Sequence, residues 1–115
     1  MRKIIIIISV IFFASSCRTE SSNKPTKFLE QKEFVNILVE IHLSDAVAEE
    51  KAQGDVKIEN LIASKGITQI LKNKNLNRPQ FDSIFNFYVR DPKLLNEVYT
   101  DVIDELSRKQ AELVR

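Results

Sequence analysis

The sequence is poor in several residue types that build chemical sites. Its 115 residues include one cysteine and one histidine. One cysteine cannot form a disulfide within the chain, and this pair is a poor start for a zinc site that needs three or four protein ligands. Two glycines are too few for a glycine-rich phosphate loop. We therefore expect no metal, no cofactor and no enzymatic activity.

The chain also has few helix-breaking residues and no excess of charge of one sign. The chain has two glycines and three prolines, and it shows no convincing run of alternating apolar and polar residues. This combination predicts an all-α protein. The 17 basic and 16 acidic residues are mixed along the chain. Because nucleic-acid binding needs a positive patch, we predict no nucleic-acid partner.

No apolar run is long enough to cross a membrane. The longest, from Ile4 to Ala14, follows the basic residues Arg2 and Lys3. As a helix it would rise roughly 16 Å, about half of the ~30 Å hydrocarbon core of a bilayer. A basic start followed by a short apolar run is typical of an export signal, so we assign residues 1–16 to a signal peptide.

The single cysteine follows this segment directly. Ala14, Ser15 and Ser16 precede Cys17, and the stretch resembles a lipobox, in which the thiol receives a diacylglyceryl group, the preceding peptide bond is cut and the new amine is acylated. Two or more acyl chains anchor a protein stably where one chain is marginal. We therefore predict that Cys17 is lipidated and holds the chain on a membrane. The alternative is an unmodified, unpaired cysteine that is buried.

A polar segment separates Cys17 from the first apolar pattern. Residues 18–27 show no apolar periodicity and are typical of a flexible tether, which would span roughly 15 to 20 Å on average. We assign residues 17–28 to the lipidated cysteine and tether, and residues 29–115 to a helical domain.

The domain is predicted to be a small bundle of about four helices. The first, over residues 30–52, carries apolar residues over so broad an arc that it must contact more than one neighbour, and Gly54 ends it. It is therefore the central helix. The second covers residues 57–75, and Gly66 in its middle, which costs about 1 kcal/mol relative to alanine, is a point where it can split in two.

Capping residues mark the two remaining helices. Asn77 begins the third, where Gln80 is placed to complete a capping box, and Asp91 followed by Pro92 begins the fourth. The fourth helix has the strongest apolar periodicity in the chain. Because only a few residues connect them, these two helices are predicted to meet at a tight corner or hairpin.

Three segments carry a resemblance to a known family: ILVEIHLSDA from Ile37 to Ala46, FDSIFNFY from Phe81 to Tyr88, and DPKLLNEVY from Asp91 to Tyr99. With the lipobox-like stretch, their order and spacing resemble a family of small lipoproteins of Bacteroidota that carries domain of unknown function 4296. The resemblance covers nearly all of the chain after Cys17 and implies a small helical lipoprotein of the cell envelope. It implies no activity, substrate or catalytic residue.

The residues after the cysteine bear on location. Surface-displayed lipoproteins of such bacteria have an acidic cluster just after the lipidated cysteine, whereas here Arg18, Thr19 and a single acid, Glu20, follow Cys17. This departure favours the outer membrane with the domain facing the periplasm.

His42 is the one candidate for chemistry. It lies three residues before Asp45, so both share one face of the first helix, within its apolar arc. The pair can act as an oriented general base or as one arm of a metal site. We favour a buried polar pair satisfied by its own hydrogen bonds. No serine lies in a glycine-flanked elbow, which argues against a hydrolase.

Aromatic residues are concentrated in the third helix. Most fall on one apolar stripe and are predicted to be core, but Phe87 lies partly off this stripe and is the predicted exposed contact with a partner. The charged final segment, residues 104–115, is predicted to be a solvated helix end rather than a binding element; the alternative is that Leu106 and Leu113 extend an apolar seam to a partner.

These features leave three functions open. The favoured one is a non-enzymatic accessory lipoprotein that binds another envelope protein. The alternative is a carrier of a small ligand or lipid with a pocket near His42 and Asp45. A hydrolase or metalloenzyme that uses His42 ranks last.

Overall fold

The computed structural model describes residues 27–114, and this part of the chain forms four α-helices and no strand. They are α2 (Gln31–Ala52), α3 (Val56–Asn73), α4 (Arg78–Val89) and α5 (Pro92–Leu113). The prediction of a small all-α bundle of about four helices is confirmed. The predicted signal peptide, Cys17 and most of the predicted tether lie outside the described residues.

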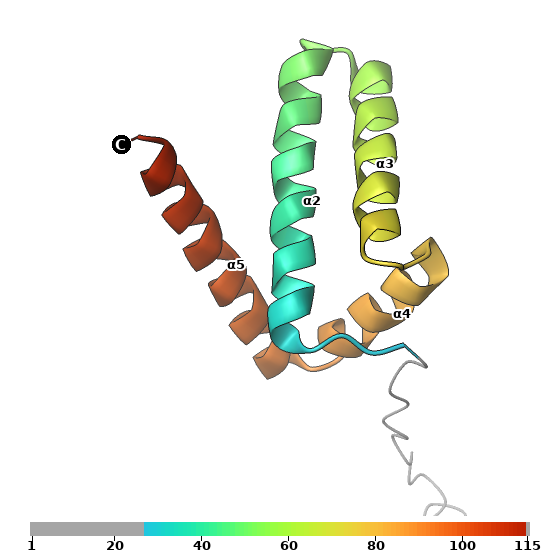
Figure 1. Cartoon of the computed structure of the whole chain (residues 1–115), viewed down its shortest axis with the longest axis vertical. Coiled ribbons are helices and arrows are strands. Elements are labelled where there is room, and N and C mark those ends of the chain that lie inside the picture. Colours follow the sequence, from blue (N-terminus) through green and yellow to red (C-terminus); the bar gives the residue numbers. More distant parts are fainter. Residues whose placement is uncertain (1–26, 115) are drawn as a thin grey trace, which may run out of the picture.

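The first helix of the domain, α2, lies at its centre. Figure 1 shows α3 antiparallel to α2 on one side and α5 on the other, while α4 crosses near the lower ends of α2 and α3. Toward its C-terminal end, α5 diverges from α2, so that the two helices form a V. The predicted central position of this helix is confirmed.

Local capping sets the starts of α4 and α5. The Asn77 side chain accepts a hydrogen bond from the Gln80 backbone N–H at 2.9 Å, and the Gln80 side chain accepts one from the Asn77 backbone N–H at 2.9 Å. The predicted capping box is therefore present. Asp91 Oδ1 accepts hydrogen bonds from two backbone N–H groups in the first turn of α5, at 3.0 and 3.2 Å. Only Arg90 and Asp91 separate the two helices, which confirms the tight corner.

Two residues in left-handed backbone conformations end α2. Gln53 has φ 50° and Gly54 has φ 90°. Glycine adopts such a φ without a steric penalty, so the predicted end of the helix at Gly54 follows from its missing Cβ. Asp55 then caps α3 by accepting hydrogen bonds from two backbone N–H groups, at 2.9 and 3.2 Å.

The helix α3 is continuous, so the split considered at Gly66 does not occur. Gly66 lies where α3 passes close to α2: a Cβ built on it would be 2.1 Å from Ser44 Oγ and 3.4 Å from Ser44 Cβ. The missing Cβ therefore leaves room for the Ser44 hydroxyl between the two helices, which offsets the low helix propensity of glycine.

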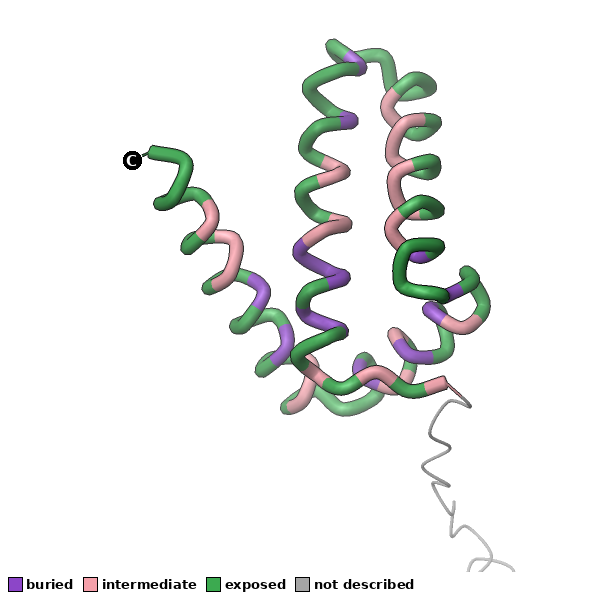
Figure 2. The backbone as a smooth tube through the Cα atoms, viewed as in Figure 1, coloured by how far each residue is buried: buried purple, intermediate pink, exposed green. Residues whose placement is uncertain are grey.

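The hydrophobic core lies at the end of the bundle where α4 crosses. Figure 2 shows buried segments in the lower half of α2, along α4 and near the start of α5. The largest fully buried side chains come from these three helices: Phe34, Ile37, Val39, Ile84, Tyr88, Val98 and Val102. In the upper half of α2, the buried residues are the small Ala48 and Ala52.

The segment before α2 also packs on this core. The Tyr88 hydroxyl donates a hydrogen bond to the Leu29 carbonyl oxygen at 2.6 Å, and the Tyr88 ring stacks on Phe34 with centroids 4.4 Å apart. Leu29 packs against the core and precedes the N-cap Glu30. Leu29 and Phe34 thus occupy the two positions of a hydrophobic staple, which fixes how the chain enters the helix.

Candidate functional site

The structure leaves His42 outside the core. His42 is exposed and Asp45 is half-buried, and among the described residues no hydrogen bond joins their side chains. The prediction of a buried polar pair is therefore wrong. His42 lies two turns beyond Val35 on nearly the same side of α2. Near Val35, which is buried, α5 is close enough for Gln31 to donate a hydrogen bond to Asp101 at 3.1 Å. Because α5 then diverges from α2 (Figure 1), this side is uncovered by the level of His42.

No ligand set gathers around His42 within the structure described. Across residues 27–114, no three or more His, Cys, Asp and Glu side chains are grouped so as to hold a metal ion. A surface depression lies between the end of α3 and the start of α4, lined by residues between Ser64 and Gln80. Neither His42 nor Asp45 contributes to it. None of the described helices is both apolar enough and long enough to span a bilayer.

Phe87 is less available than the sequence predicts. It is half-buried because Phe28, from the segment before α2, packs against it edge-on with ring centroids 5.1 Å apart. Phe28 was assigned to the predicted tether, yet its ring packs on the helical domain. Phe87 as a partner contact stays a prediction, with a smaller free surface than expected.

The largest exposed apolar feature of α5 is an uncharged face. At about 100° per residue, the eight charged side chains of α5 fall within an arc of roughly 160°, and the remainder of the circumference carries none. We give the name α5 face to a set of neighbouring residues within this remainder: Tyr99, Ile103, Leu106, Gln110, Leu113 and, at the C-cap, Val114. The exposed polar residues Asn96, Thr100 and Ser107 lie in the same uncharged arc and border this face.

Most of the α5 face is open to solvent. Ile103 is 61% exposed, Leu113 87% and Val114 83%, whereas Val98 and Val102 on the adjoining side are buried against the core. Leu106 is half-buried and lies where the two sides meet. The core therefore covers only the first half of α5. Apolar side chains continue along the second half, where nothing in the described structure covers them.

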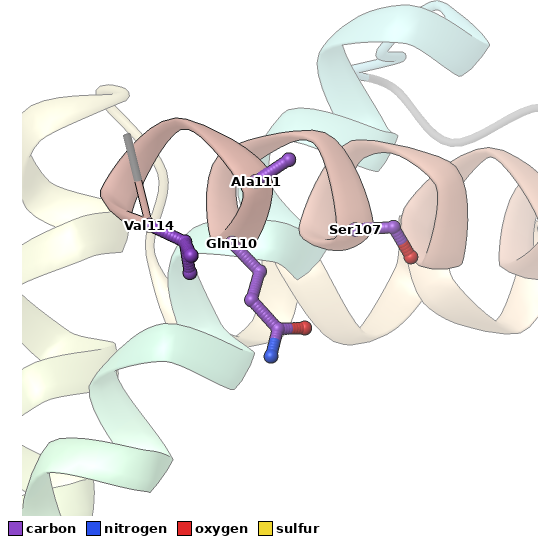
Figure 3. Close-up of a pocket in the computed structure, with 4 residues that line it drawn as sticks. All are labelled: Ser107, Gln110, Ala111 and Val114. Carbon is purple, nitrogen blue, oxygen red and sulfur yellow. The ribbon is translucent and has the colours of Figure 1, made fainter.

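A shallow depression adjoins the α5 face near its C-terminal end. It is lined by Ser107, Gln110, Ala111 and Val114 (Figure 3). Gln110 and Val114 project from the same side of the helix, whereas Ser107 and Ala111 contribute only small side chains.

The sequence anticipated part of this site. An apolar seam through Leu106 and Leu113 was the alternative to a solvated helix end, and both residues lie on the α5 face. Ile103 falls at a helical spacing from Tyr99 and Leu106, and this periodicity does not distinguish it from the core positions of the helix. No local signal marks where the neighbouring helix ceases to cover α5, so the exposure of Ile103 appears only in the folded structure.

Comparison with known proteins places the chain in a family without an assigned function. A family model described as Domain of unknown function (DUF4296) matches residues 25–112. No curated protein and no solved structure matches the chain significantly. The matched range spans all four helices and covers well over half of the sequence. The resemblance carried by the segments around Ile37, Phe81 and Asp91 is thereby confirmed, and the chain belongs to the DUF4296 family.

Proposed function

We propose that this protein is a lipid-anchored accessory subunit of the cell envelope, without enzymatic activity, that binds another envelope protein through the α5 face. The observation that carries the proposal is the exposure of the α5 face, on which Ile103, Leu113 and Val114 are each more than half exposed. Interface cores are depleted of charge and enriched in such side chains, and contiguous exposed apolar patches mark interaction sites.

The energy available on this face suits a tethered partner. Fully burying an aliphatic side chain contributes roughly 1.5–3 kcal/mol, so covering the exposed parts of Ile103, Leu113 and Val114 would contribute roughly 5 kcal/mol in total. Association of free proteins costs about as much or more. Confinement of both partners to one membrane raises their effective concentration and lowers that cost. The predicted lipid on Cys17 and the modest α5 face therefore support each other.

The net charge of α5 indicates a further property of the partner. α5 carries three basic and five acidic residues, for a net charge of 3 − 5 = −2. A partner that covers the α5 face would place its flanks beside this acidic arc. We infer that the partner presents an apolar surface, bordered by basic residues, to α5.

Three features of the sequence support the proposed location. The signal-peptide pattern, the stretch before Cys17 and the absence of an acidic cluster after it support lipid anchoring at the outer membrane, with the domain in the periplasm. The intact mass of the protein purified from membranes tests the anchor directly. We expect a chain that begins at Cys17 and carries acyl groups, and we expect Cys17→Ser to keep the uncleaved signal and to add no acyl mass.

Photocrosslinking in living cells tests the docking surface. A photoreactive residue replaces Ile103 or Leu113 in turn, and Val47, which is 44% exposed on α2, serves as the matched control. We expect Ile103 and Leu113 to capture the same envelope protein and Val47 to capture none of it. Ile103→Asp should then abolish capture from Leu113. Equal capture from Val47, or different proteins from the two α5 positions, would contradict the proposal.

A further inference from the structure

The helices of the domain differ in net charge. α2 carries two basic and five acidic residues, for 2 − 5 = −3, and α5 carries 3 − 5 = −2. α3 carries three basic residues and one acidic residue, for 3 − 1 = +2. Since α3 and α5 lie on opposite sides of α2 (Figure 1), the domain has one basic side and one acidic side.

The basic residues of α3 form a single stripe. Lys57, Leu61, Lys65, Thr68 and Lys72 follow one another at intervals of three or four residues, which places them on one helix face, and all five are exposed. We call these residues the α3 stripe. Within residues 27–114, its three lysine side chains form no ion pair, and Leu61 between them is 56% exposed.

Acidic side chains near the α3 stripe are engaged elsewhere. Glu59, the single acid of α3, is half-buried and lies on the side of the helix that faces α2. Glu40 of α2 pairs with Lys74 at 3.2 Å, and Asp82 of α4 pairs with Arg78 at 3.0 Å. Asp55, the N-cap of α3, lies beside Lys57, where its carboxylate accepts hydrogen bonds from two backbone N–H groups. Lys65 and Lys72 therefore carry the uncompensated positive charge that the stripe presents to solvent.

The N-terminal segment reaches the domain beside this stripe. The Lys27 ammonium donates a hydrogen bond to the carbonyl oxygen of Asn75, just after the end of α3 and one turn beyond Lys72. Nine residues separate Lys27 from Cys17, and a chain of that length reaches at most roughly 35 Å even when fully extended. A lipid on Cys17 would thus hold the α3 end of the domain, and not the free end of α5, close to the bilayer.

We propose that the α3 stripe docks on an anionic phospholipid surface. The three lysines would lie against the lipid phosphates with their aliphatic stems along the headgroups, and Leu61 would enter the interface between them. The acidic α5 would be repelled from the same surface and would keep the α5 face directed away from the membrane. The inference rests on the proposed anchor, and it adds the orientation of the domain.

The test uses the absence of tryptophan from the chain. Leu61→Trp and Ile103→Trp each introduce one fluorophore, at sites that are 56% and 61% exposed. The chain from Cys17 to Arg115 is coupled through its single thiol to a maleimide lipid in phosphatidylcholine vesicles, with or without phosphatidylglycerol. Spin-labelled headgroups then quench any tryptophan that lies at the surface. Because the coupling is chemical, the outcome does not depend on lipidation in the cell.

We expect quenching at position 61 in the anionic vesicles, much less in the neutral ones, and little at position 103 in either. A surface lysine contributes about a fivefold factor to binding of an anionic membrane, so Lys65→Gln/Lys72→Gln should weaken docking roughly 25-fold, whereas Lys32→Gln/Lys93→Gln, with the same change in charge, should not. Equal quenching at positions 61 and 103, or quenching at 61 that persists in the Lys65→Gln/Lys72→Gln variant, would overturn the inference. An unmodified Cys17 in the cellular protein would instead overturn the proposed anchor and leave this result intact.

Discussion

The contact between Gly66 and Ser44 makes a quantitative prediction about helix packing. Gly66 lies inside α3 with an ordinary helical φ, so replacing it with alanine should stabilise the helix by about 1 kcal/mol. The added Cβ, however, would lie 2.1 Å from Ser44 Oγ. Relieving that clash requires the Ser44 hydroxyl to rotate or the helices to separate, and overpacking of this kind costs about 1–3 kcal/mol. We therefore expect Gly66→Ala alone to be neutral or to destabilise the protein by up to about 2 kcal/mol.

Removing the hydroxyl should reverse the sign. In a Ser44→Ala background, the new Cβ meets the Cβ of residue 44 at 3.4 Å, which is an ordinary contact. Gly66→Ala should then stabilise the fold by about 1 kcal/mol, which corresponds to about 4–8 °C in Tm for a domain of this size. The double-mutant cycle should therefore give a coupling energy of at least about 1 kcal/mol.

Urea denaturation followed by circular dichroism measures all four corners of this cycle. Ser107→Ala provides the matched control, because Ser107 is an exposed serine on α5 and does not approach Gly66. In that background Gly66→Ala should behave as it does in the wild type. A coupling energy near zero between Gly66→Ala and Ser44→Ala would refute the reasoning, since the Ser44 hydroxyl would then not be the group that opposes a Cβ at position 66.

Three further predictions concern the core, one helix cap and alkaline pH. Val98→Ala should destabilise the protein by about 2 kcal/mol because Val98 is fully buried. Ile103→Ala, at a site 61% exposed on the same helix, should change the unfolding free energy by less than about 0.5 kcal/mol. Urea titration of both variants measures the difference. Asn77→Ala should cost about 1 kcal/mol through loss of the capping box, while Asn96→Ala in the second turn of α5 should cost nothing, as thermal unfolding will show. Burial raises the pKa of Tyr88, and the carboxylates of Glu30 and Glu33 raise it further. Because the folded state then holds the hydroxyl proton more tightly than the unfolded state, stability should be constant below about pH 10 and should fall as the pH rises further. Tyr88→Phe should remove this fall. Urea denaturation midpoints measured between pH 8 and 11 test both expectations.

The features that could be predicted from the sequence are those that depend on neighbours in the chain. Asn77 with Gln80, Asp91 with Pro92, and Gly54 each act on backbone groups within a few residues, so these helix boundaries follow from local chemistry. The broad apolar arc of α2 also predicted its central place, because an arc wider than one neighbour requires two.

The features that the sequence did not predict depend on contacts between segments that are distant in the chain. The arc that contains Val35 also contains His42, and helical periodicity assigns both to one side; only the departure of α5 from α2 makes Val35 buried and His42 exposed. Phe87 lies at the edge of its stripe, but its cover comes from Phe28, which the polar residues before it had led us to place in the tether. Gly66 has a known cost in any helix, whereas its benefit lies in Ser44, which is 22 positions away in the sequence.

The second half of α5 contributes little to the packing of the domain. None of residues 107–114 is buried, so these turns add little to the core, while they expose Leu113 and Val114 almost completely. Their helical form is supported locally, since Arg108 pairs with Glu105 and with Glu112 along the charged arc. Ion pairs on one side and uncovered apolar residues on the other give a helix that forms without a partner and presents its apolar side to one. With the α3 stripe directed at the membrane, this half of α5 would project from the opposite side of the domain, where a neighbouring envelope protein can reach it.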